Sequence, residues 1–327
     1  MGRHHFIGAR DIDRAAARLR DGGLVAFPTE TVYGLGADAA NDEAVARIFE
    51  IKGRPAFNPL IVHVADRQMA GAVAVFGPAA ERLAEIFWPG PLTLVLPRRE
   101  GTRPVSRLAS AGLDTVALRQ PDHRLAQALL AAADRPIAAP SANRSGGLSP
   151  TRAEHVDLPQ PSDHPGGRSD DLLVIDGGPC PVGIESTVVE VHDGRIHILR
   201  PGGVPEDEIA ARSGLEMTLG ATSDGAAKSP GQGARHYAPA TKLRLEASQV
   251  AADEVLLAFG PTPPKGAART ENLSAKGDLR EAAANLFAML HTLDGEGARA
   301  IAVMPVPDFG LGLAINDRLR RGAEIDQ

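Results

Sequence analysis

The sequence predicts an α/β protein built from two domains, on three observations. The chain has 327 residues, whereas a domain of ordinary size has roughly 100–200. Short apolar runs and amphipathic helical stretches occur both before residue 205 and after residue 243. The segment between them is rich in Gly, Ala, Ser and Pro, which is the composition of a linker. We therefore expect domains over residues 1–205 and 243–327, joined by a linker over residues 206–242.

The first domain is predicted to contain one mixed sheet. Apolar runs typical of buried strands cover residues 24–27, 60–64, 92–96, 115–118, 136–139, 172–175, 184–191 and 196–199. Helical periodicity covers residues 11–20, 42–52, 78–87 and 122–133. Asp193-Gly194 separates the last two strands and is a hairpin signal. Because few helices separate the later strands, a mixed sheet is favoured over a regularly alternating parallel one.

The second domain is predicted to be a small doubly wound α/β unit. Glu254–Phe259 and Ala300–Met304 are apolar runs of the kind found in buried parallel strands. Helices are expected at residues 278–291 and 311–322.

Composition is that of an ordinary soluble globular protein, with 43% hydrophobic and 23% charged residues. The first residues, MGRHHFIGARDIDRAA, lack the apolar core of a secretory signal, and no apolar run approaches the length of a membrane span. Cys180 is the only cysteine, which excludes an intrachain disulfide and a cysteine-based zinc site. We expect a cytoplasmic protein.

Charge argues against a stable complex with nucleic acid. Residues 1–205 carry 22 Lys and Arg against 24 Asp and Glu, and residues 206–327 carry 13 against 17. Neither part has the basic excess of a protein that binds a phosphate backbone strongly.

The segment from Phe27 to Val64 has the pattern of a site for a small anionic ligand. A buried strand ends at Phe27, and the polar residues that follow Pro28 interrupt it. Asn41 or Asp42 is expected to cap the next helix, and Gly53 to end it in a left-handed conformation.

Lys52 and Arg54 lie where this helix ends. Cations are stable near a helix C-terminus without any ligand, which is the ordinary interpretation. Lys52 is, however, the only lysine in the first 227 residues, in a chain with thirty arginines. A compact ammonium binds phosphate as a point charge, so an anion-binding role is an equally good interpretation.

Polar residues also accompany later strands. Arg119 ends the run VALR, where its guanidinium could hold a carboxylate through two N–H groups or could simply lie in solvent. His63 lies in the alternating run LIVHV, where a structural histidine is the alternative to a ligand contact. Ser141 and Asn143 follow PIAA and face the same way in an extended chain, although such residues also form ordinary polar turns.

The order of these motifs resembles that of the YrdC-like family in its two-domain form. The matching pieces are PTETVYGLG at 28–36, KGRPAFNPLIVHV at 52–64, WPGPLTLVL at 88–96, VALRQP at 116–121, APSANRSG at 139–146, ESTVVEV at 185–191, LRPGG at 199–203, SPGQGARHYAP at 229–239 and GLGLAINDRLRRGA at 310–323. The resemblance implies a twisted α/β sheet around an open cavity, followed by a small Rossmann-like domain.

The same resemblance implies a nucleotidyltransferase that makes threonylcarbamoyl-AMP from L-threonine, bicarbonate and ATP and releases pyrophosphate. A carbamate formed on the threonine amine would attack the α-phosphate of ATP, with Mg²⁺ bridging the phosphate oxygens. The chain has no GxxxxGK[ST] motif, so ATP would be held without a P-loop. The product would pass to a separate complex that transfers the threonylcarbamoyl group to tRNA.

The resemblance also implies roles for individual residues. Lys52 and Arg54 would carry the catalysis by neutralising phosphate charge. The expected ATP contacts are Lys52, Arg54, Asn58, Thr115, Ala139, Ser149, Arg200 and Tyr237. The expected threonine contacts are Thr31, His63, Arg119, Ser141 and Ser186, with Asn143 as a further candidate. No protein side chain is assigned to the metal.

The segment Ser229–Pro239 is the expected lid, because a carbamoyl-adenylate is a mixed anhydride that water destroys and the site has to close. Tyr237, one of two tyrosines in the chain, would cover the nucleotide. The middle of the segment reads Gly231-Gln232-Gly233-Ala234, where the family has bulkier or basic residues. Its contacts are therefore left open.

Three other interpretations fit the sequence less well. Gly34–Ala39 imitates the GxGxxA fingerprint of dinucleotide oxidoreductases, but six residues separate it from Phe27, and the true fingerprint lies directly at a strand-to-helix turn. A related carbamoyl-adenylate-forming maturation enzyme shares the YrdC-like domain but carries cysteine-rich zinc modules, which a single cysteine excludes. A non-enzymatic nucleotide- or RNA-binding module is opposed by the acidic balance of the chain.

Overall fold

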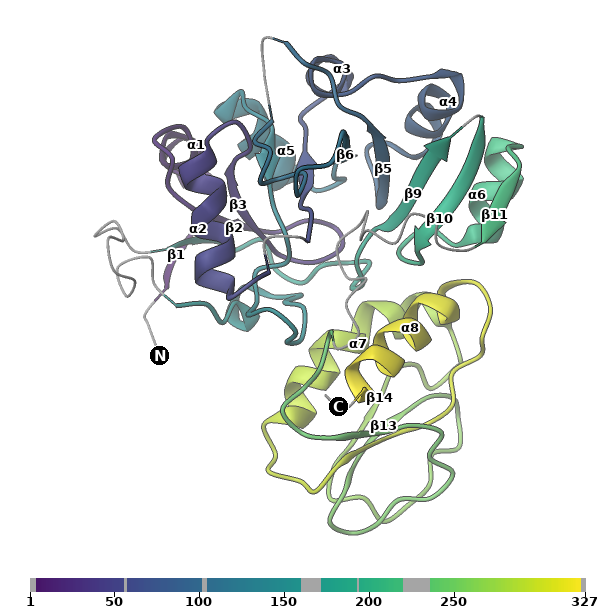
Figure 1. The fold of residues 1–327 in the computed structure, drawn as a ribbon. Coiled ribbons are helices and arrows are strands. Elements are labelled where there is room, and N and C mark those ends of the chain that lie inside the picture. The colour runs from purple at the N-terminus through teal and green to yellow at the C-terminus, as the bar shows by residue number, and fades with distance from the viewer. Residues whose placement is uncertain are drawn as a thin grey trace.

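A computed structural model describes residues 4–55, 58–101, 105–159, 172–192, 194–219 and 236–324. The chain forms two α/β parts, which lie one above the other in Figure 1. The first part contains an eleven-stranded sheet and the second a four-stranded sheet. Among the described residues, no helix is both long and apolar enough to cross a membrane.

The large sheet is mixed, as predicted. In spatial order its strands are β1 (His5–Ile7), β8 (Leu173–Ile175), β2 (Val25–Phe27), β3 (Gly34–Asp38), β7 (Ile137–Ala138), β4 (Ile61–His63), β6 (Thr115–Arg119), β5 (Leu92–Pro97), β9 (Thr187–His192), β10 (Arg195–Arg200) and β11 (Met217–Leu219). β9 and β10 pair antiparallel, so the predicted hairpin is confirmed, although Asp193 itself lies outside the described residues. Pairs such as β4 with β6 are parallel.

Helices accompany the large sheet, and its α-helices bury apolar residues in the core of the first part. The helices are η1 (Ala9–Asp11), α1 (Ile12–Arg20), α2 (Asp42–Lys52), α3 (Arg67–Val73), α4 (Pro78–Phe87), α5 (Arg124–Ala133), η2 (Ala153–His155) and α6 (Glu206–Ser213). α1 packs beside α5, and Leu19 and Leu129 share a core cluster with Phe27 of the sheet.

The helix that leads into the predicted anion site is capped at both ends as its sequence suggests. The side chain of Asn41 accepts a hydrogen bond from the backbone of Ala44 at 3.0 Å, so Asn41 and not Asp42 is the N-cap of α2. Gly53 ends the helix with a φ of 60°, a left-handed conformation that glycine adopts without strain.

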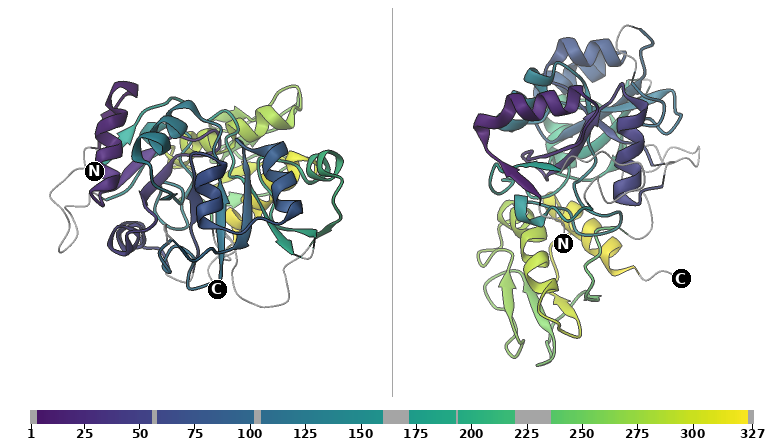
Figure 2. Two further views of the ribbon diagram at one scale, coloured as in Figure 1. Left: turned by 90° about the horizontal axis from the view of Figure 1, so that it is seen from above. Right: turned by 90° about the vertical axis from the view of Figure 1, so that its left-hand side faces the viewer.

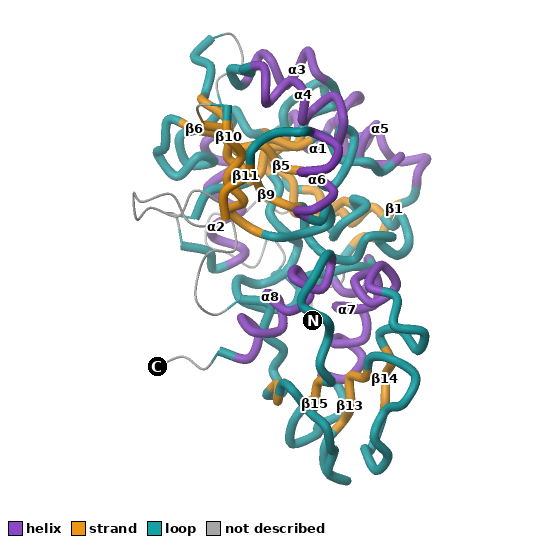
Figure 3. The backbone as a smooth tube through the Cα atoms, turned by 90° about the vertical axis from the view of Figure 1, so that its right-hand side faces the viewer, coloured by secondary structure: helices purple, strands orange, loops and turns teal. Residues whose placement is uncertain are grey.

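The second part has an all-parallel sheet, in the order β12 (Leu243–Arg244), β15 (Ile301–Val303), β13 (Val255–Ala258) and β14 (Thr270–Asn272). Its helices are α7 (Leu279–Asp294) and α8 (Leu311–Ala323). Figure 3 shows both helices on the side of this sheet that faces the first part. The expected doubly wound arrangement is therefore wrong in one respect: helices cover one face only, because the connections from β12 to β13 and from β13 to β14 are loops.

The boundary between the parts also differs from the predicted linker. Residues 206–219, placed in the linker by composition, form α6 and β11 instead, and β11 extends the large sheet by pairing parallel to β10. Residues 220–235 lie outside the described part of the chain. The right-hand view of Figure 2 shows the second part directly below the first, with α7 and α8 at the junction.

Gly34, Leu35 and Gly36 lie within β3, not at a turn between a strand and a helix. The dinucleotide fingerprint therefore lacks the geometry that would let its glycines approach a pyrophosphate.

Candidate active site

A pocket that is partly open to solvent lies where the first part meets residues 236–237. It brings together all five residues expected to contact threonine: Thr31, His63, Arg119, Ser141 and Ser186. Four of the expected ATP contacts also line it: Arg54, Ala139, Arg200 and Tyr237. Segments far apart in the sequence thus meet at one site.

The remaining expected residues do not line this pocket. They are Lys52, Asn58, Thr115 and Ser149, together with the further candidate Asn143. Thr115 starts β6 and pairs with Pro97, so it lies at the opposite end of the strand from Arg119. The side chain of Asn143 donates to the carbonyls of Arg144 and Gly147, which is the contact of a polar turn.

Lys52 is buried behind the pocket wall, with 3% of its surface exposed. Its ammonium donates to the carbonyl of Ser141 at 2.6 Å and to the carbonyl of Asn143. Burial, with the charge of Arg54 adding to it, lowers the pKa of Lys52 well below its ordinary value. In this arrangement Lys52 supports the turn that presents Ser141, and it is not itself exposed to the pocket.

Arg54 is a buried cation at the pocket surface. Within the described residues its hydrogen-bond acceptors are carbonyls, those of Asn58 at 3.4 Å and Pro59 at 3.1 Å. Burial lowers the pKa of Arg54 to about 10, so the guanidinium remains charged at neutral pH. The dipoles of these carbonyls therefore stabilise the charge of Arg54, and the guanidinium can still bind an anion.

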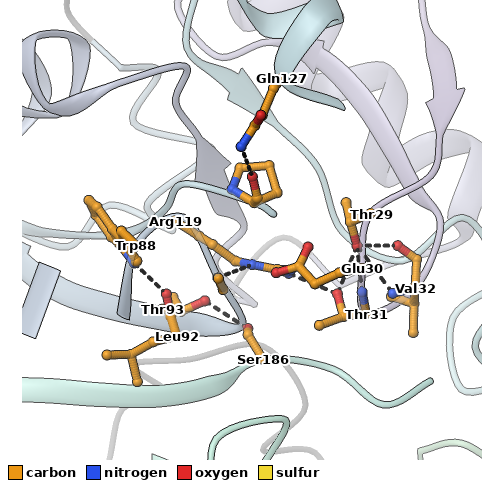
Figure 4. Close-up of polar contacts among 12 residues, drawn as sticks. Thr29, Glu30, Thr31, Val32, Trp88, Leu92, Thr93, Arg119, Gln127 and Ser186 are labelled. Carbon is orange, nitrogen blue, oxygen red and sulfur yellow. Dashed lines mark hydrogen bonds and ion pairs between the residues drawn. The ribbon is translucent and has the colours of Figure 1, made fainter. Parts of the chain in front are cut away.

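Arg119 is fixed by three partners (Figure 4). Its Nε donates to the carbonyl of Gly90 at 3.2 Å, and its Nη1 donates to the hydroxyl of Thr31 at 2.9 Å. Its Nη2 lies 2.6 Å from Oε1 of Glu30, an ion pair that lacks the alignment of a hydrogen bond. Both partners of this ion pair are buried. The alternative of a strand end in solvent is therefore excluded, and Nη2 still has N–H groups to offer.

His63 lies beside Arg119, because β4 and β6 pair in parallel with these two residues in register. Its ring meets the ring of Phe27 edge-on at 5.9 Å. Burial, with Arg119 adding to it, lowers the pKa of His63 to about 3, so the imidazole is neutral at neutral pH. Its Nδ1 has no hydrogen-bond partner among the described residues.

Ser186 closes the opposite side of the pocket. Its hydroxyl lies 2.7 Å from that of Thr93, a pair shown in Figure 4, and its carbonyl accepts from Nη2 of Arg200 at 2.8 Å. Burial lowers the pKa of Arg200 from its ordinary value. Arg54, Arg119 and Arg200 give the pocket three cations, of which Arg119 is paired with Glu30, and among its described lining residues Glu185 supplies the one carboxylate. This balance suits an anionic ligand.

Sequence reasoning missed Glu30, Glu185 and the residue that Glu185 contacts, Arg318. Glu30 and Glu185 lie inside the quoted motifs PTETVYGLG and ESTVVEV, and Arg318 lies inside GLGLAINDRLRRGA. A charged residue inside such a motif indicates a candidate functional role. The sequence does not show, however, that all three residues are buried.

Glu185 is in contact with a residue of the second part of the chain. Its Oε1 accepts from the hydroxyl of Ser149, and its Oε2 accepts from Nε of Arg318 at 2.8 Å. Burial alone would raise the pKa of Glu185, but Arg318 and Arg200 outweigh it and lower that pKa, so the carboxylate is charged.

Tyr237 and His236 form the edge of the pocket nearest the second part. Tyr237 has a φ of 64° and is buried, and its hydroxyl has no hydrogen-bond partner within the described ranges. Burial lowers the pKa of His236 to about 3. Of the expected lid, residues 236–239 are described, and Ser229–Arg235 lie outside the described residues.

Comparison with known proteins gives full-length relatives. The profile of a family described as "telomere recombination" (Sua5, YciO and YrdC) matches residues 17–202, and a profile described as the C-terminal domain of threonylcarbamoyl-AMP synthase matches residues 204–324. A threonylcarbamoyl-AMP synthase of Pyrococcus abyssi is 42% identical over 94% of this chain and 93% of its own length. A threonylcarbamoyl-AMP synthase of Bacillus subtilis is 41% identical over 95% of this chain and 92% of its own length.

Solved structures agree with these relatives. The crystal structure of P. abyssi Sua5 complexed with L-threonine has a TM-score of 0.84 and 40% sequence identity, and the match covers 98% of this chain and 97% of that one. Escherichia coli YciO, at 24% identity and a TM-score of 0.51, matches the fold over 62% of this chain.

Proposed function

The chain belongs to the Sua5/YrdC family of threonylcarbamoyl-AMP synthases, and we propose that it makes threonylcarbamoyl-AMP from L-threonine, bicarbonate and ATP, releasing pyrophosphate. One observation carries the proposal. A single pocket contains all five residues expected to contact threonine, in a chain 40% identical to a protein that was solved with L-threonine bound.

The amino acid would bind at the Arg119 side of the pocket. The N–H groups of Arg119 Nη2 would take its carboxylate, next to the ion pair with Glu30. The neutral His63 and the hydroxyl of Ser186 would meet its polar groups. A neutral imidazole suits this place, because a second cation beside Arg119 would repel the first.

ATP would bind at the Arg54 and Arg200 side. Nucleotidyl transfer needs positioning and charge neutralisation more than covalent help from the protein. Arg54 and Arg200 would contact the phosphates directly, while Lys52 would act from behind, by fixing the carbonyls of Ser141 and Asn143. The carbamate of threonine, a nucleophile, would then attack the α-phosphate and displace pyrophosphate.

Magnesium is expected to accompany ATP. In the described ranges, no group of three or more His, Cys, Asp or Glu side chains could hold a metal ion, and no protein ligand is proposed for the magnesium. A magnesium ion bound to the phosphate oxygens would neutralise part of their charge when ATP binds.

The pyrophosphate assay tests this proposal. Purified protein is incubated with ATP, bicarbonate and magnesium, with and without L-threonine, and both pyrophosphate and threonylcarbamoyl-AMP are measured. Release that depends on threonine, with the adenylate formed in parallel, is the expected result. Absence of threonine-dependent release would leave the alternative of a nucleotide- or RNA-binding module without synthase activity.

The product would pass to a separate complex that transfers the threonylcarbamoyl group to tRNA. A protein that supplies this modification belongs where tRNA is modified, and the proposal places it in the cytoplasm. The acidic balance of the chain supports a handover of the small adenylate over stable binding of tRNA by this protein itself.

A further inference from the structure

The second part of the chain packs against the segments that build the pocket. Val32, Leu148 and Ile184 belong to the first part, yet each is buried in the same apolar cluster as Leu286 and Ile315 of α7 and α8. Val32 follows Thr31, Leu148 precedes Ser149, and Ile184 precedes Glu185. Thr31 and Glu185 line the pocket and Ser149 contacts the Glu185 carboxylate, and the chain neighbour of each of the three packs against the second part.

Arg318 makes a polar contact at the centre of this junction. It is 1% exposed, which is unusual for an arginine. Its Nε donates to Glu185 at 2.8 Å, and its Nη1 donates to Asp317 at 2.6 Å. Its guanidinium also lies over the ring of Tyr237, 4.9 Å from the ring centre. Arg318 does not line the pocket, but Glu185 and Tyr237, which it contacts, both do.

The segment at Ser149 is held by both helices of the second part. Ser149 donates its hydroxyl to Glu185, which α8 holds through Arg318. The carbonyl of Ser149 lies 3.2 Å from Nε2 of His291 on α7. The backbone N–H of Ala238, next to Tyr237, donates to the carbonyl of Gly146 at 2.8 Å. These contacts join the turn at residues 146–149, the Glu185 segment and the 237–238 segment.

We propose that Arg318 is a positioning residue for the reaction: from the second domain it fixes the Glu185 carboxylate and the Tyr237 ring in the wall of the pocket. The inference rests on the proposed function, and it assigns the second domain a part in building the site. An arginine that served only to join the domains would need no contact with two pocket residues at once. Arg318 uses one face of its guanidinium for the ring and one edge for the carboxylate.

The variants Arg318→Met, Arg318→Lys, Glu185→Gln and the double variant Arg318→Met/Glu185→Gln test this role. The measured quantity is kcat/KM for ATP in threonine-dependent pyrophosphate release, well below each protein's unfolding temperature. We expect Arg318→Met to lower this kcat/KM roughly ten- to hundredfold. Arg318→Lys keeps the positive charge but not the planar guanidinium, so its kcat/KM should fall less than that of Arg318→Met. Arg320→Gln, on the same helix but exposed, is the matched control and should equal the wild type.

The coupling between the two residues separates positioning from general stability. If Arg318 acts chiefly through Glu185, replacing Arg318 should lower kcat/KM much less in the Glu185→Gln background than in the wild type, and the loss that remains measures the contact with the Tyr237 ring. If the losses in kcat/KM of the two single variants multiply in the double variant, the proposal is overturned. An Arg318→Met protein that is folded and lies within about twofold of wild-type kcat/KM would also overturn it.

The pH profile gives a second readout. Glu185 faces Ser149, Arg318, Arg200, Tyr237 and His236, and Arg318 also contacts Asp317. Without Arg318, burial should raise the pKa of Glu185, and ionising the poorly compensated carboxylate should disturb the site. The activity of Arg318→Met relative to wild type should therefore fall as the pH rises through the raised pKa of Glu185, and this trend should disappear in the double variant. A ratio that is flat with pH contradicts the role.

Two provisions keep the test decisive. If Arg318→Met does not fold, Arg318→Lys decides, because a Lys variant with wild-type kcat/KM overturns the proposal. Wild-type turnover is measured first. If the wild type makes no threonylcarbamoyl-AMP, the proposed function fails, whereas wild-type turnover with undisturbed Arg318 variants refutes the positioning role alone.

Discussion

Arg54 and Lys52 are neighbouring buried cations with different surroundings, and they should respond differently to removal. Arg54→Ala takes away a charge at the pocket surface, and such a charge-assisted contact contributes about 1.5–3 kcal/mol. Pyrophosphate release should fall roughly ten- to hundredfold. Stability should fall less than for Lys52→Ala, because the hydrogen bonds of Arg54 to its two carbonyls are longer than those of Lys52. Lys52→Ala leaves two buried carbonyls without their donor, so it should lower both the free energy of unfolding and turnover.

Steady-state pyrophosphate release and urea denaturation measure the two effects. Arg107→Ala is a suitable control, because this arginine is exposed and lies outside the pocket. Wild-type turnover of Arg54→Ala at saturating ATP would remove Arg54 from the phosphate site. Unchanged stability of Lys52→Ala would mean that water or ATP replaces the ammonium.

Arg119 is the residue expected to choose the amino acid. Arg119→Lys keeps a cation beside Glu30 but cannot donate at once to Gly90, Thr31 and a carboxylate. The affinity for L-threonine should drop about tenfold or more while the affinity for ATP barely changes. Calorimetric titration of each ligand measures this. Equal weakening of both ligands would show that Arg119 supports the pocket as a whole.

At the scale of single elements, periodicity predicted most helices and strands because their apolar faces are buried against the core. β3 escaped prediction, since GLGAD is poor in the residues that favour strands. The structure shows why a glycine occupies position 36: a Cβ there would lie 2.8 Å from the ring of Phe27 and 2.9 Å from Ile137. The packing that selects this glycine comes from other strands, and the local sequence does not contain it.

The packing at Gly36 leads to a stability prediction. Gly36→Ala should overpack the sheet and lower the free energy of unfolding by about 1–3 kcal/mol. Gly71→Ala is the matched control, because Gly71 lies within α3 and a Cβ there would meet nothing within 4 Å. That control should gain up to about 1 kcal/mol from better helix propensity. Chemical denaturation of both variants measures the difference, and a neutral Gly36→Ala would contradict the close approach.

The site shows the same division between what local sequence predicts and what packing adds. Strand ends place His63 and Arg119 side by side, because adjacent parallel strands end at one edge of the sheet. A sequence pattern was enough to select them. The burial of Glu30 against Arg119, and of Glu185 against Arg318, depends on contacts between residues 89 and 133 positions apart. No local spacing contains that information.

At the scale of the whole molecule, the two domains are less separable than composition suggests. Truncation after residue 205 would remove α6 and β11 and uncover Val32, Leu148 and Ile184. We expect such a protein to be strongly destabilised, with truncation after residue 219 less damaging because β11 is kept. Circular dichroism with urea compares the two, and wild-type threonine affinity in the shorter protein would refute this.

Tyr237 connects the domains to the chemistry, and its replacement tests closure of the site. Its ring lies between the pocket and the second domain, 5.8 Å from the ring of Phe287, and burial raises the pKa of its hydroxyl, which therefore stays protonated. Tyr237→Ala should open the pocket to water while leaving the arginines in place. Because the carbamoyl-adenylate is a mixed anhydride, we expect pyrophosphate in excess of intact threonylcarbamoyl-AMP.

Rapid quench of single turnovers measures both products in one sample. Tyr237→Phe is the control, since it keeps the ring and loses only the hydroxyl, and it should restore the wild-type ratio if the ring excludes water. If Tyr237→Ala and Tyr237→Phe both produce less intact adenylate than pyrophosphate, the effect belongs to the hydroxyl. This hydroxyl has no hydrogen-bond partner among the described residues, and its partner would then be the nucleotide. Equal amounts of pyrophosphate and adenylate from Tyr237→Ala, at the wild-type rate, would show that this residue tethers the domains without closing the site.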